Sequence, residues 1–262
     1  MCIVGSVGRG AENNAVDVKT VQILLNVNLA GWDGTEPLLV DGLAGDQTGR
    51  AIARFQARSA PAVPPDGRIN PRDGTLKALA AGLPAQLTAE TLLGIMIHAA
   101  PGRVEAFVNP LAEKMTARGI DTARRRAHFL AQVGHESGEL RYTEEIASGD
   151  AYEGRRDLGN TEAGDGRRFK GRGLIQLTGR ANYRAFGQAI GVDLLSGDNP
   201  QRIATDPWLA VEVACWFWQA RGLNALADAD DAHAVTRRIN GGLNGLADRL
   251  RQLDRARFFL QA

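Results

Sequence analysis

The sequence predicts a mainly helical protein with two domains, a small three-helix unit over residues 1–82 and a larger helical domain over residues 88–262. First, 262 residues exceed the size of one typical domain. Second, apolar side chains recur at the three-and-four spacing of helices through most of the chain. Third, this periodicity fails between residues 141 and 175, where Gly, Asp and Arg abound. We therefore expect a small irregular or β segment there, lining a cleft in the larger domain.

The first domain is expected to hold three helices joined by turns. Residues 16–27 place apolar side chains on one helical face, and Asp17 can cap the start of this helix. The segments VDGLAGDQTGRAIARFQ and PDGRINPRDGTLKALA each combine a DG turn with an apolar-periodic run, which predicts the second and third helices. Residues 83–87 follow as a short linker, because Gly82 and Pro84 interrupt the helical pattern.

The larger domain then shows five further helical signals, separated by the irregular stretch. Each has apolar side chains at helical spacing, and several begin after a residue that can cap a helix. The segments are TAETLLGIMIHAA, VEAFVNPLAEKMTARG, TARRRAHFLAQVGHESG, DPWLAVEVACWFWQARGL and ADDAHAVTRRING.

The composition excludes several function classes. The chain has 31 Lys and Arg against 30 Asp and Glu, a formal net charge of +1, which gives no argument for a nucleic-acid partner. Cys2 and Cys215 are too few and too far apart to suggest a disulfide framework, so both are expected to be free thiols. The histidines lack the paired spacing of metal ligands. We therefore expect neither a metal nor an organic cofactor.

The opening residues MCIVGSVGRGAENN show neither a charged leader nor the apolar core of a secretory signal, so synthesis in a cytoplasm is expected. No apolar stretch reaches the roughly 18 residues of a membrane span, so no membrane insertion is expected. Nothing in the sequence requires more than a monomer. If the substrate lies outside the membrane, another agent must deliver the protein there.

Glu136 is the first candidate for chemistry. It ends the run HFLAQVGHE, whose apolar side chains predict a helix, and Gly138 can stop that helix. A carboxyl at this end faces the negative pole of the helix dipole, which disfavours its charge and helps keep it protonated. Glu136 is therefore a candidate general acid, and the alternative is an ordinary exposed glutamate at a helix end.

Acid-catalysed cleavage of a sugar chain also needs a second carboxylate across the sugar. Glu139 would share a face with Glu136 if the helix continued, so it could not reach across a sugar ring. Glu144 and Glu145 follow in a segment that is free to cross a cleft. At most one of these two can point inward from an extended segment.

The block GRGLIQLTGRANY at 171–183 supplies the polar wall of such a site. Its glycines let the backbone approach a ligand, and Gln176, Thr178 and Asn182 provide amide and hydroxyl groups. Strand-like alternation through residues 174–178 would put Gln176 and Thr178 on one side. Such a wall can hold sugar hydroxyls and N-acetyl groups without charge.

Two resemblances join these observations. The segments DVKTVQILLN, VDGLAGDQTGRAIARFQ and PDGRINPRDGTLKAL resemble the small peptidoglycan-binding domain of bacterial and phage cell-wall hydrolases. The segments AHFLAQVGHESGELRYTEE, YEGRRDLGNTEAGDGRRFKGRGLIQLTGRANY and TRRINGGLNG resemble the glycoside hydrolase family 19 catalytic domain of plant chitinases and many phage endolysins. The second resemblance implies an α-rich, lysozyme-like fold with a cleft and an inverting mechanism.

The resemblance also implies roles for single residues. Glu136 would protonate the glycosidic oxygen, Glu145 would activate a water on the opposite face, and Thr178 would help to position that water. Glu144 would take the base role if the segment were shifted by one residue. Further residues are expected to bind the substrate or organise the site, with His135 and Tyr183 open to a purely structural reading: His135, Tyr142, Gln176, Asn182, Tyr183 and Asn240.

As a whole, the chain resembles a modular phage endolysin. This implies muramidase-like hydrolysis of β-1,4 bonds in peptidoglycan glycan strands, at the periplasmic cell wall, after release from the host cytoplasm through a membrane lesion. A chitinase acting on N-acetylglucosamine polymers is the first alternative, although the chain lacks the many cysteines and longer loops of plant chitinases. The others are an injected antibacterial effector and a wall-binding protein without turnover.

Overall fold

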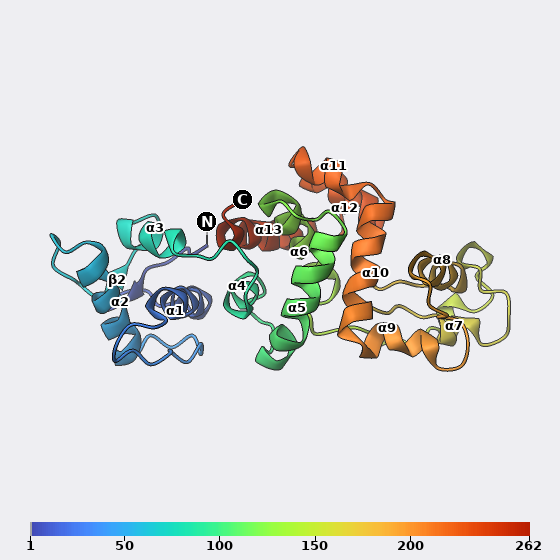
Figure 1. Ribbon diagram of the computed structural model, residues 1–262, viewed down its shortest axis with the longest axis horizontal. Helices are drawn as coiled ribbons and strands as arrows, with labels where there is room; N and C mark the ends of the chain where they lie inside the picture. The colour runs from blue at the N-terminus through green and yellow to red at the C-terminus, as the bar shows by residue number, and fades with distance from the viewer. Residues whose placement is uncertain (1) are drawn as a thin grey trace. The chain divides into compact units, whose positions relative to one another are not determined.

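A computed structural model describes residues 2–262, and the fold is mainly helical, as the sequence predicts (Figure 1). The chain divides into two compact units. The smaller unit takes the residues up to His98 together with Leu253–Ala262, and the larger unit is Ala99–Gln252. This division differs from the expected domain boundary, and the linker at 83–87 stays a prediction.

The smaller unit contains the three helices expected near the N-terminus. A two-stranded antiparallel sheet accompanies them, in which Val7 pairs with Ile69. The apolar face of the first helix, with Val18 and Val21 fully buried, forms the centre of the core. The elements are β1 (Val7–Gly8), α1 (Ala15–Leu29), α2 (Asp46–Ser59), β2 (Arg68–Ile69), α3 (Gly74–Ala81) and α4 (Ala89–Ile95).

Asp17 does not cap the first helix, so that expectation is wrong. The cap position is Asn14, and Asp17 lies buried in the first turn. Its carboxylate accepts hydrogen bonds from the backbone N–H groups of Val4 at 3.1 Å and Gly5 at 2.8 Å. The carboxylate therefore fixes the segment that precedes the helix, because the buried N–H of Gly5 would otherwise lack a partner.

The end of the last helix, α13 (Leu246–Leu260), belongs to the core of the smaller unit. Phe259 is fully buried, and a Cβ added at Gly94 would lie 2.3 Å from its ring. Arg255 Nε donates to the Gly94 carbonyl oxygen at 3.0 Å, and Gln261 Nε2 donates to the Ala80 carbonyl oxygen at 3.1 Å. Segments from both ends of the chain thus share one core, which local sequence patterns could not predict.

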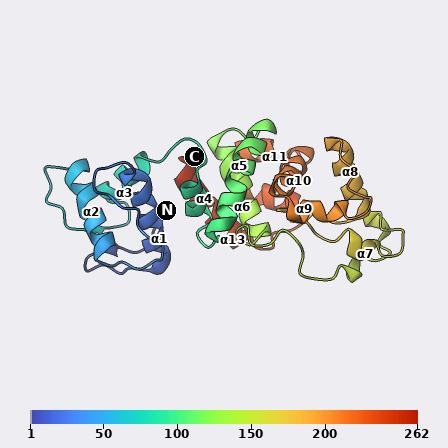
Figure 2. The same ribbon diagram turned by 60° about the horizontal axis from the view of Figure 1, so that its bottom comes forward.

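The larger unit is organised around one apolar helix, α10. Figures 1 and 2 show α10 between α5 on one side and α7 and α8 on the other. Phe129 of α6 meets Trp218 of α10 edge to face, with ring centroids 5.4 Å apart. The elements are α5 (Pro101–Ala117), α6 (Ala123–Glu136), η1 (Asp150–Tyr152), η2 (Arg156–Leu158), α7 (Asp165–Arg168), α8 (Arg180–Ile190), η3 (Asn199–Gln201), α9 (Arg202–Thr205), α10 (Pro207–Ala220), α11 (Leu223–Asp228), α12 (Ala232–Asn240) and the start of α13.

The stretch predicted to be irregular packs through Phe169 on a small apolar core that other elements complete. Phe169, Tyr183 and Phe186 are fully buried and pack together with Ile203 and Val213. In the stretch itself the regular structure consists of short helical turns and isolated bridges, such as the one between Glu144 and Arg172. The loops are therefore anchored from behind by an apolar cluster, which leaves their polar side chains available to a site.

Candidate functional site

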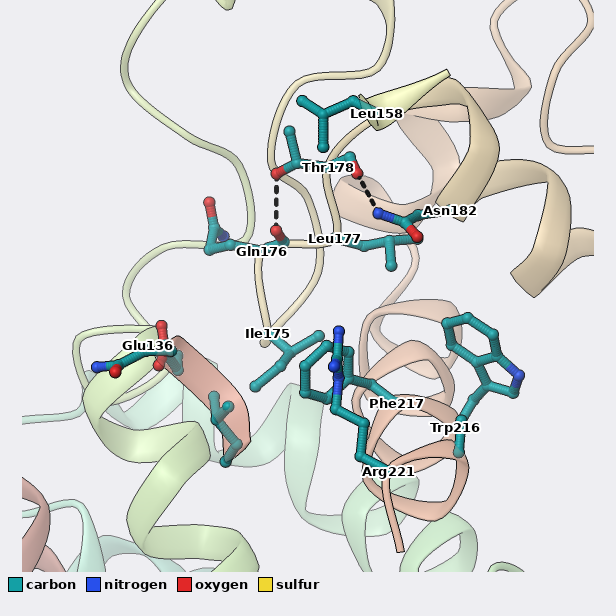
Figure 3. A pocket seen from close by; sticks show the side chains of 13 residues that line it. Glu136, Leu158, Ile175, Gln176, Leu177, Thr178, Asn182, Trp216, Phe217 and Arg221 are labelled. Carbon is teal, nitrogen blue, oxygen red and sulfur yellow. Dashed lines mark hydrogen bonds between the residues drawn. The ribbon is translucent and has the colours of Figure 1, made fainter. Parts of the chain in front are cut away.

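A pocket of about 410 Å³ lies in the larger unit, where α6, α8, α10 and α12 approach the loop before α8. Figure 3 shows Glu136 on one side of it, with Gln176, Thr178 and Asn182 along one edge and aromatic residues of α10 along another. The lining combines one carboxylate, several amides and an apolar face: Glu136, Leu158, Ile175, Gln176, Leu177, Thr178, Asn182, Trp216, Phe217, Ala220, Arg221, Ile239 and Asn240.

Glu136 is the last residue of α6, as the sequence predicts. The helix stops because Gly138 adopts a φ of +58°, a left-handed conformation that glycine enters without strain. Oε1 of Glu136 accepts a hydrogen bond from Arg249 Nη2 at 2.5 Å, and the Glu136 side chain keeps 21% of its surface exposed. The carboxyl group is thus held by a charged partner on a residue that lines the pocket.

Arg249 changes the electrostatic argument for Glu136. It is 3% exposed, and its other contacts are the Gln132 side-chain oxygen at 2.5 Å and the Asn244 carbonyl oxygen at 3.3 Å. Its guanidinium makes a charge-assisted hydrogen bond to Glu136 and fixes the orientation of the carboxyl group. The expectation from the helix dipole alone is therefore incomplete, because it omits a cation that is 113 positions away in the sequence.

Glu139 does not continue the helical face of Glu136. Gly138, Glu139 and Leu140 all have positive φ values, so the chain turns away directly after the helix. The Glu139 carboxylate accepts from Gln252 Nε2 at 3.0 Å, and Glu139 is not among the residues that line the pocket. The shared helical face on which Glu139 was set aside is therefore not formed, and Glu139 instead lies outside the pocket lining.

Glu144 and Glu145 point to different partners. Glu144 pairs with Arg172 through Nε at 2.9 Å and lies 3.6 Å from Lys170 Nζ. Glu145 has no such ion pair in the described chain: Oε1 accepts from the Tyr152 hydroxyl at 3.0 Å, and Oε2 accepts from the Gly171 N–H at 3.2 Å. Neutral donors hold Glu145, whereas cations neutralise Glu144, so the geometry favours Glu145 for proton chemistry.

Glu145 lies next to the pocket rather than in its wall. A Cβ added at Gly171 would lie 3.0 Å from Gln176 Oε1 and 3.3 Å from Glu145 Oε2, so both oxygens converge on this glycine. Gln176 lines the pocket, and Glu145 is therefore adjacent to it through Gln176. The absence of a side chain at position 171 leaves room for the two groups.

Gln176 and Thr178 reach the pocket by a different route from the one expected. The alternating strand through 174–178 is not formed. Arg172 and Leu177 exchange two backbone hydrogen bonds, and Gln176 at the turn has a φ of +56°. Thr178 Oγ1 donates to the Gln176 carbonyl oxygen at 2.9 Å, and Asn182 Nδ2 donates to the Thr178 carbonyl oxygen at 2.7 Å (Figure 3). A tight, internally bonded turn therefore presents these side chains.

Asn240 and His135 belong to the other side of the site. Asn240 lines the pocket, and its amide closes the following turn through the Asn244 carbonyl oxygen at 3.0 Å and the Gly242 N–H at 2.8 Å. His135 Nδ1 lies 2.6 Å from Asp248 Oδ2 and is not part of the pocket lining. His135 thus organises the segment that carries Arg249, whereas Asn240 faces the pocket.

The two predicted tyrosines lie outside the pocket lining. Tyr183 is fully buried, and its hydroxyl donates to the Lys170 carbonyl oxygen at 2.7 Å and accepts from Arg172 Nη1 at 3.1 Å. Burial raises the pKa of Tyr183 to about 12, so the hydroxyl stays protonated. Tyr142 is 37% exposed, with the Arg141 guanidinium 5.1 Å from its ring centroid. Tyr183 therefore supports the turn from behind.

Sequence reasoning missed Arg249, Tyr152 and the aromatic face of α10. Arg249 and Tyr152 had no signal, because each acts through a contact that only the fold creates. Trp216 and Phe217 stand in the run CWFW of a segment expected only to be helical, and both keep part of their surface exposed. Three aromatic residues within four positions cannot all face one core, and that count could have pointed to a second, ligand-facing side.

Among residues 2–262 no group of three or more His, Cys, Asp or Glu side chains is arranged to hold a metal ion. Cys2 and Cys215 are buried free thiols, as expected, and burial raises the pKa of both, that of Cys2 to about 11. In the same part of the chain no helix has the length and apolar character to cross a bilayer.

Comparison with known proteins identifies the larger unit. Residues 104–237 match the family model described as Chitinase class I, of glycoside hydrolase family 19. A glycosyl hydrolase family 19 domain-containing protein of Haemophilus influenzae is 32% identical over 180 residues, which cover 57% of this chain and 86% of that protein. An endochitinase of Arabidopsis thaliana is 36% identical over 138 residues, 53% of this chain and 47% of the plant protein.

A solved structure agrees with these sequence matches. Chitinase C of Streptomyces griseus superimposes with a TM-score of 0.57 at 25% identity, over 67% of this chain and 93% of that one. The chain spans about half of the plant relative and most of the two bacterial proteins. From these matches and from the site in its larger unit, we conclude that the chain belongs to glycoside hydrolase family 19 and is a glycoside hydrolase.

Proposed function

We propose that the protein is an endolysin that hydrolyses β-1,4 bonds between the amino sugars of bacterial peptidoglycan, with muramidase-like selectivity and inversion at the anomeric carbon. One observation carries this proposal. A carboxyl group, Glu136, borders a pocket of amides and hydroxyls, while a second carboxylate, Glu145, lies beside it on a separate loop. Two carboxyl groups from different segments are what single displacement by water requires.

In this mechanism Glu136 is the general acid. Arg249 donates to Oε1, which leaves Oε2 to carry a proton toward the glycosidic oxygen of the leaving sugar. Gln132 and the Asn244 carbonyl oxygen fix Arg249, so Glu136 has little freedom to turn away. The acid is thus oriented before the substrate binds, which lowers the entropic cost of reaching the transition state.

Glu145 is the general base in the same mechanism. Both of its oxygens accept hydrogen bonds from neutral donors, and carboxylate oxygens have further lone pairs with which to accept a water proton. The water would attack the face of the sugar opposite Glu136, and inverting enzymes separate the two carboxyl groups by roughly 6.5 to 9.5 Å to admit it. Thr178, on the turn that also carries Gln176, helps to position that water.

The remaining walls suit an N-acetylated sugar. Gln176, Asn182 and Asn240 offer amide groups, and Trp216 and Phe217 offer flat apolar surface. Sugars present hydroxyl edges and a less polar C–H face, so a pocket with one polar and one aromatic wall can orient each ring. No charge is required for this part of the recognition.

We further propose that the smaller unit binds the cell wall. It contains its own pocket of about 370 Å³ with both polar and apolar lining: Gln56, Ser59, Ala60, Val63, Pro64, Asp66, Arg68, Asp73, Gly74, Thr75 and Ala78. Val63 is 63% exposed although it is apolar. A concave surface that combines apolar and polar side chains is typical of a ligand pocket.

Point variants test wall binding better than truncation, because α13 supplies part of the smaller unit's core. Val63→Asp should weaken co-sedimentation with purified peptidoglycan several-fold when it is made in an inactive Glu136→Gln background. Leu43→Asp is the matched control, since Leu43 is 70% exposed in the same unit but does not line the pocket. Equal binding by both variants would refute this site.

The enzymatic proposal is tested by identifying the bond that is cut. Purified peptidoglycan is digested, the fragments are reduced with borohydride, and mass spectrometry identifies the sugar at each new reducing end. Reduced muramic acid supports muramidase-like cleavage, and reduced glucosamine contradicts it. Digestion with the Glu136→Gln variant serves as the blank, because it keeps the fold without the acid.

A chitinase is the second candidate, and the matches to proteins named endochitinases favour it. Oligomers of N-acetylglucosamine, digested in parallel, separate the two. Turnover of these oligomers without turnover of peptidoglycan would establish the chitinase and refute the endolysin.

Delivery is also a proposal: the protein is made in the host cytoplasm and reaches the periplasmic wall through a membrane lesion. Expression in a bacterial cytoplasm should then leave cells intact until a pore-forming protein or chloroform opens the membrane. An injected antibacterial effector predicts instead an immunity gene beside its own. Lysis that follows expression alone would contradict delivery through a lesion.

A further inference from the structure

A second hollow of about 450 Å³ adjoins the pocket that Glu136, Gln176 and Asn240 line, which we call the sugar pocket. The two share Arg221 and Ile239 in their linings, so the surface is continuous from one to the other. Unlike the sugar pocket, this hollow is lined largely by cationic side chains: Arg221, Ala234, Arg237, Arg238, Ile239 and Gly241. We call Arg221, Arg237 and Arg238 the basic rim.

The basic rim has no counter-charge of its own. In the described part of the chain no carboxylate lies within 4 Å of any of its three guanidinium groups. Other arginines of the larger unit do have such partners, among them Arg125 with Asp228 and Arg180 with Asp165. Three unpaired cations beside a substrate pocket make a local positive field that the net charge of +1 conceals.

Two of the three rim arginines are also held in place. The Arg221 guanidinium lies 4.1 Å from the centroid of the Phe217 ring, and Arg238 Nη1 donates to the Arg221 carbonyl oxygen at 3.2 Å. Burial and, second, the positive charge of Arg238 lower the pKa of Arg221, because like charges lie close together here. An anion bound between these groups would relieve that repulsion.

We propose that the basic rim binds carboxylates on the peptide stems of peptidoglycan and thereby selects an anionic glycan over neutral chitin. The inference rests on the proposed function and deepens it. Chitin carries no charge, whereas stem peptides carry carboxylates next to the glycan. Arginine is suited to this task because its planar fork bonds both oxygens of a carboxylate.

The experiment compares two substrates that differ in charge. The values of kcat/KM are measured on soluble, uncross-linked peptidoglycan strands and on N-acetylglucosamine oligomers. In the Arg237→Gln/Arg238→Gln variant, the ratio of the first value to the second should fall about 10-fold or more, as expected for lost charge-assisted hydrogen bonds. The matched control is Arg184→Gln, an exposed arginine of α8 that lines neither hollow, and it should leave the ratio unchanged.

Neutralising the substrate supplies the reciprocal test. With the parent enzyme, converting the carboxyls of the strands to amides should lower kcat/KM by the same factor. With the double variant, this conversion should lower kcat/KM no further. Strands stripped of their stems by an amidase keep only the lactyl carboxylate of muramic acid, so they distinguish the two sources of charge. If the two rim substitutions lower kcat/KM equally on charged and neutral substrates, the rim has a structural role and the proposal is overturned.

Failure of the proposed function is distinguishable from failure of the rim. Binding of the same strands to Glu136→Gln is measured by calorimetry with and without the two rim substitutions, and this needs no turnover. If the parent fails to cleave the strands, the endolysin assignment falls. If the rim substitutions leave binding and its salt dependence unchanged, the proposal that the basic rim binds carboxylates is wrong, whichever substrate the enzyme cleaves.

Discussion

The two carboxyl groups of the site are held in opposite ways. Glu136 stands on the last turn of a helix whose apolar side is buried, and the guanidinium of Arg249 donates a hydrogen bond to it. Glu145 stands on an irregular segment, and only a phenol hydroxyl and a backbone N–H hold it. The proposed general acid is therefore set by helix packing and one strong ionic contact, whereas the proposed base is set by a network of weak contacts among loops.

This difference suits the two roles. The acid must meet one fixed oxygen of the substrate, so rigid placement is an advantage. The base must hold a water, and neutral donors leave its negative charge available for the water proton. It follows that the acid side should respond strongly to the loss of single groups, while the base side should lose activity in smaller steps. Substitutions on the two sides can test this.

The largest effect is expected from Glu136→Gln. The amide keeps the shape and the contact with Arg249 but cannot deliver a proton, so kcat should fall about 10³-fold or more. Glu139→Gln is the matched control, because Glu139 is three residues away and lies outside the pocket lining. Release of reducing ends from peptidoglycan measures both. Comparable activity of Glu136→Gln and the parent would show that Glu136 is not the general acid.

The next effect separates Glu144 from Glu145. Glu145→Gln should lower kcat roughly 10²-fold to 10³-fold with little change in KM, because a lost general base affects the chemical step. Glu144→Gln should cost much less activity and instead lower the thermal unfolding midpoint, since it leaves the buried Arg172 without its carboxylate. The reverse ranking would transfer the base role to Glu144.

Arg249 is expected to act as a positioning residue for the acid. Arg249→Gln should lower kcat about 10-fold to 100-fold, because it removes a charge-assisted hydrogen bond of about 1.5–3 kcal/mol. Arg249→Lys should rescue little, since one ammonium group cannot reach the three separate acceptors of Arg249.

A double-mutant cycle decides whether Arg249 works through Glu136. In the Glu136→Gln background, Arg249→Gln should have almost no further effect on the residual kcat. Thermal unfolding is followed in parallel to account for any loss of folded enzyme. Fully additive losses would show that Arg249 only stabilises the fold.

The same contrast explains how much of the site could be predicted from the sequence. The helix that carries Glu136 and the glycine that ends it follow from local patterns, and both are confirmed. The turn that presents Gln176 and Thr178 was wrongly expected to be a strand, because Gln176 has a positive φ that two hydrogen bonds around the turn compensate. Local propensity cannot anticipate a conformation that neighbouring contacts impose.

Long-range contacts set the remaining limit. Arg249 and Glu136 are 113 positions apart, and Phe259 joins a core whose other helices come from the first hundred residues. Neither contact leaves a local trace in the sequence. The three N-terminal helices were predictable because each has its own apolar face and turn, whereas the assembly of the acid site depends on which helices pack together.

The smallest effect is expected from Tyr152→Phe on the base side. The hydroxyl of Tyr152 donates to Glu145 at 3.0 Å, and burial together with this bond raises the pKa of the phenol, so the donor stays protonated through the neutral range. Loss of one such bond, about 1 kcal/mol, should lower kcat about five-fold, and the effect should vanish in the Glu145→Gln background. Single-turnover rates of the two single variants and the double variant measure this coupling. A loss as large as that of Arg249→Gln would contradict the proposed difference, because it would show that the base depends on one contact as strongly as the acid does.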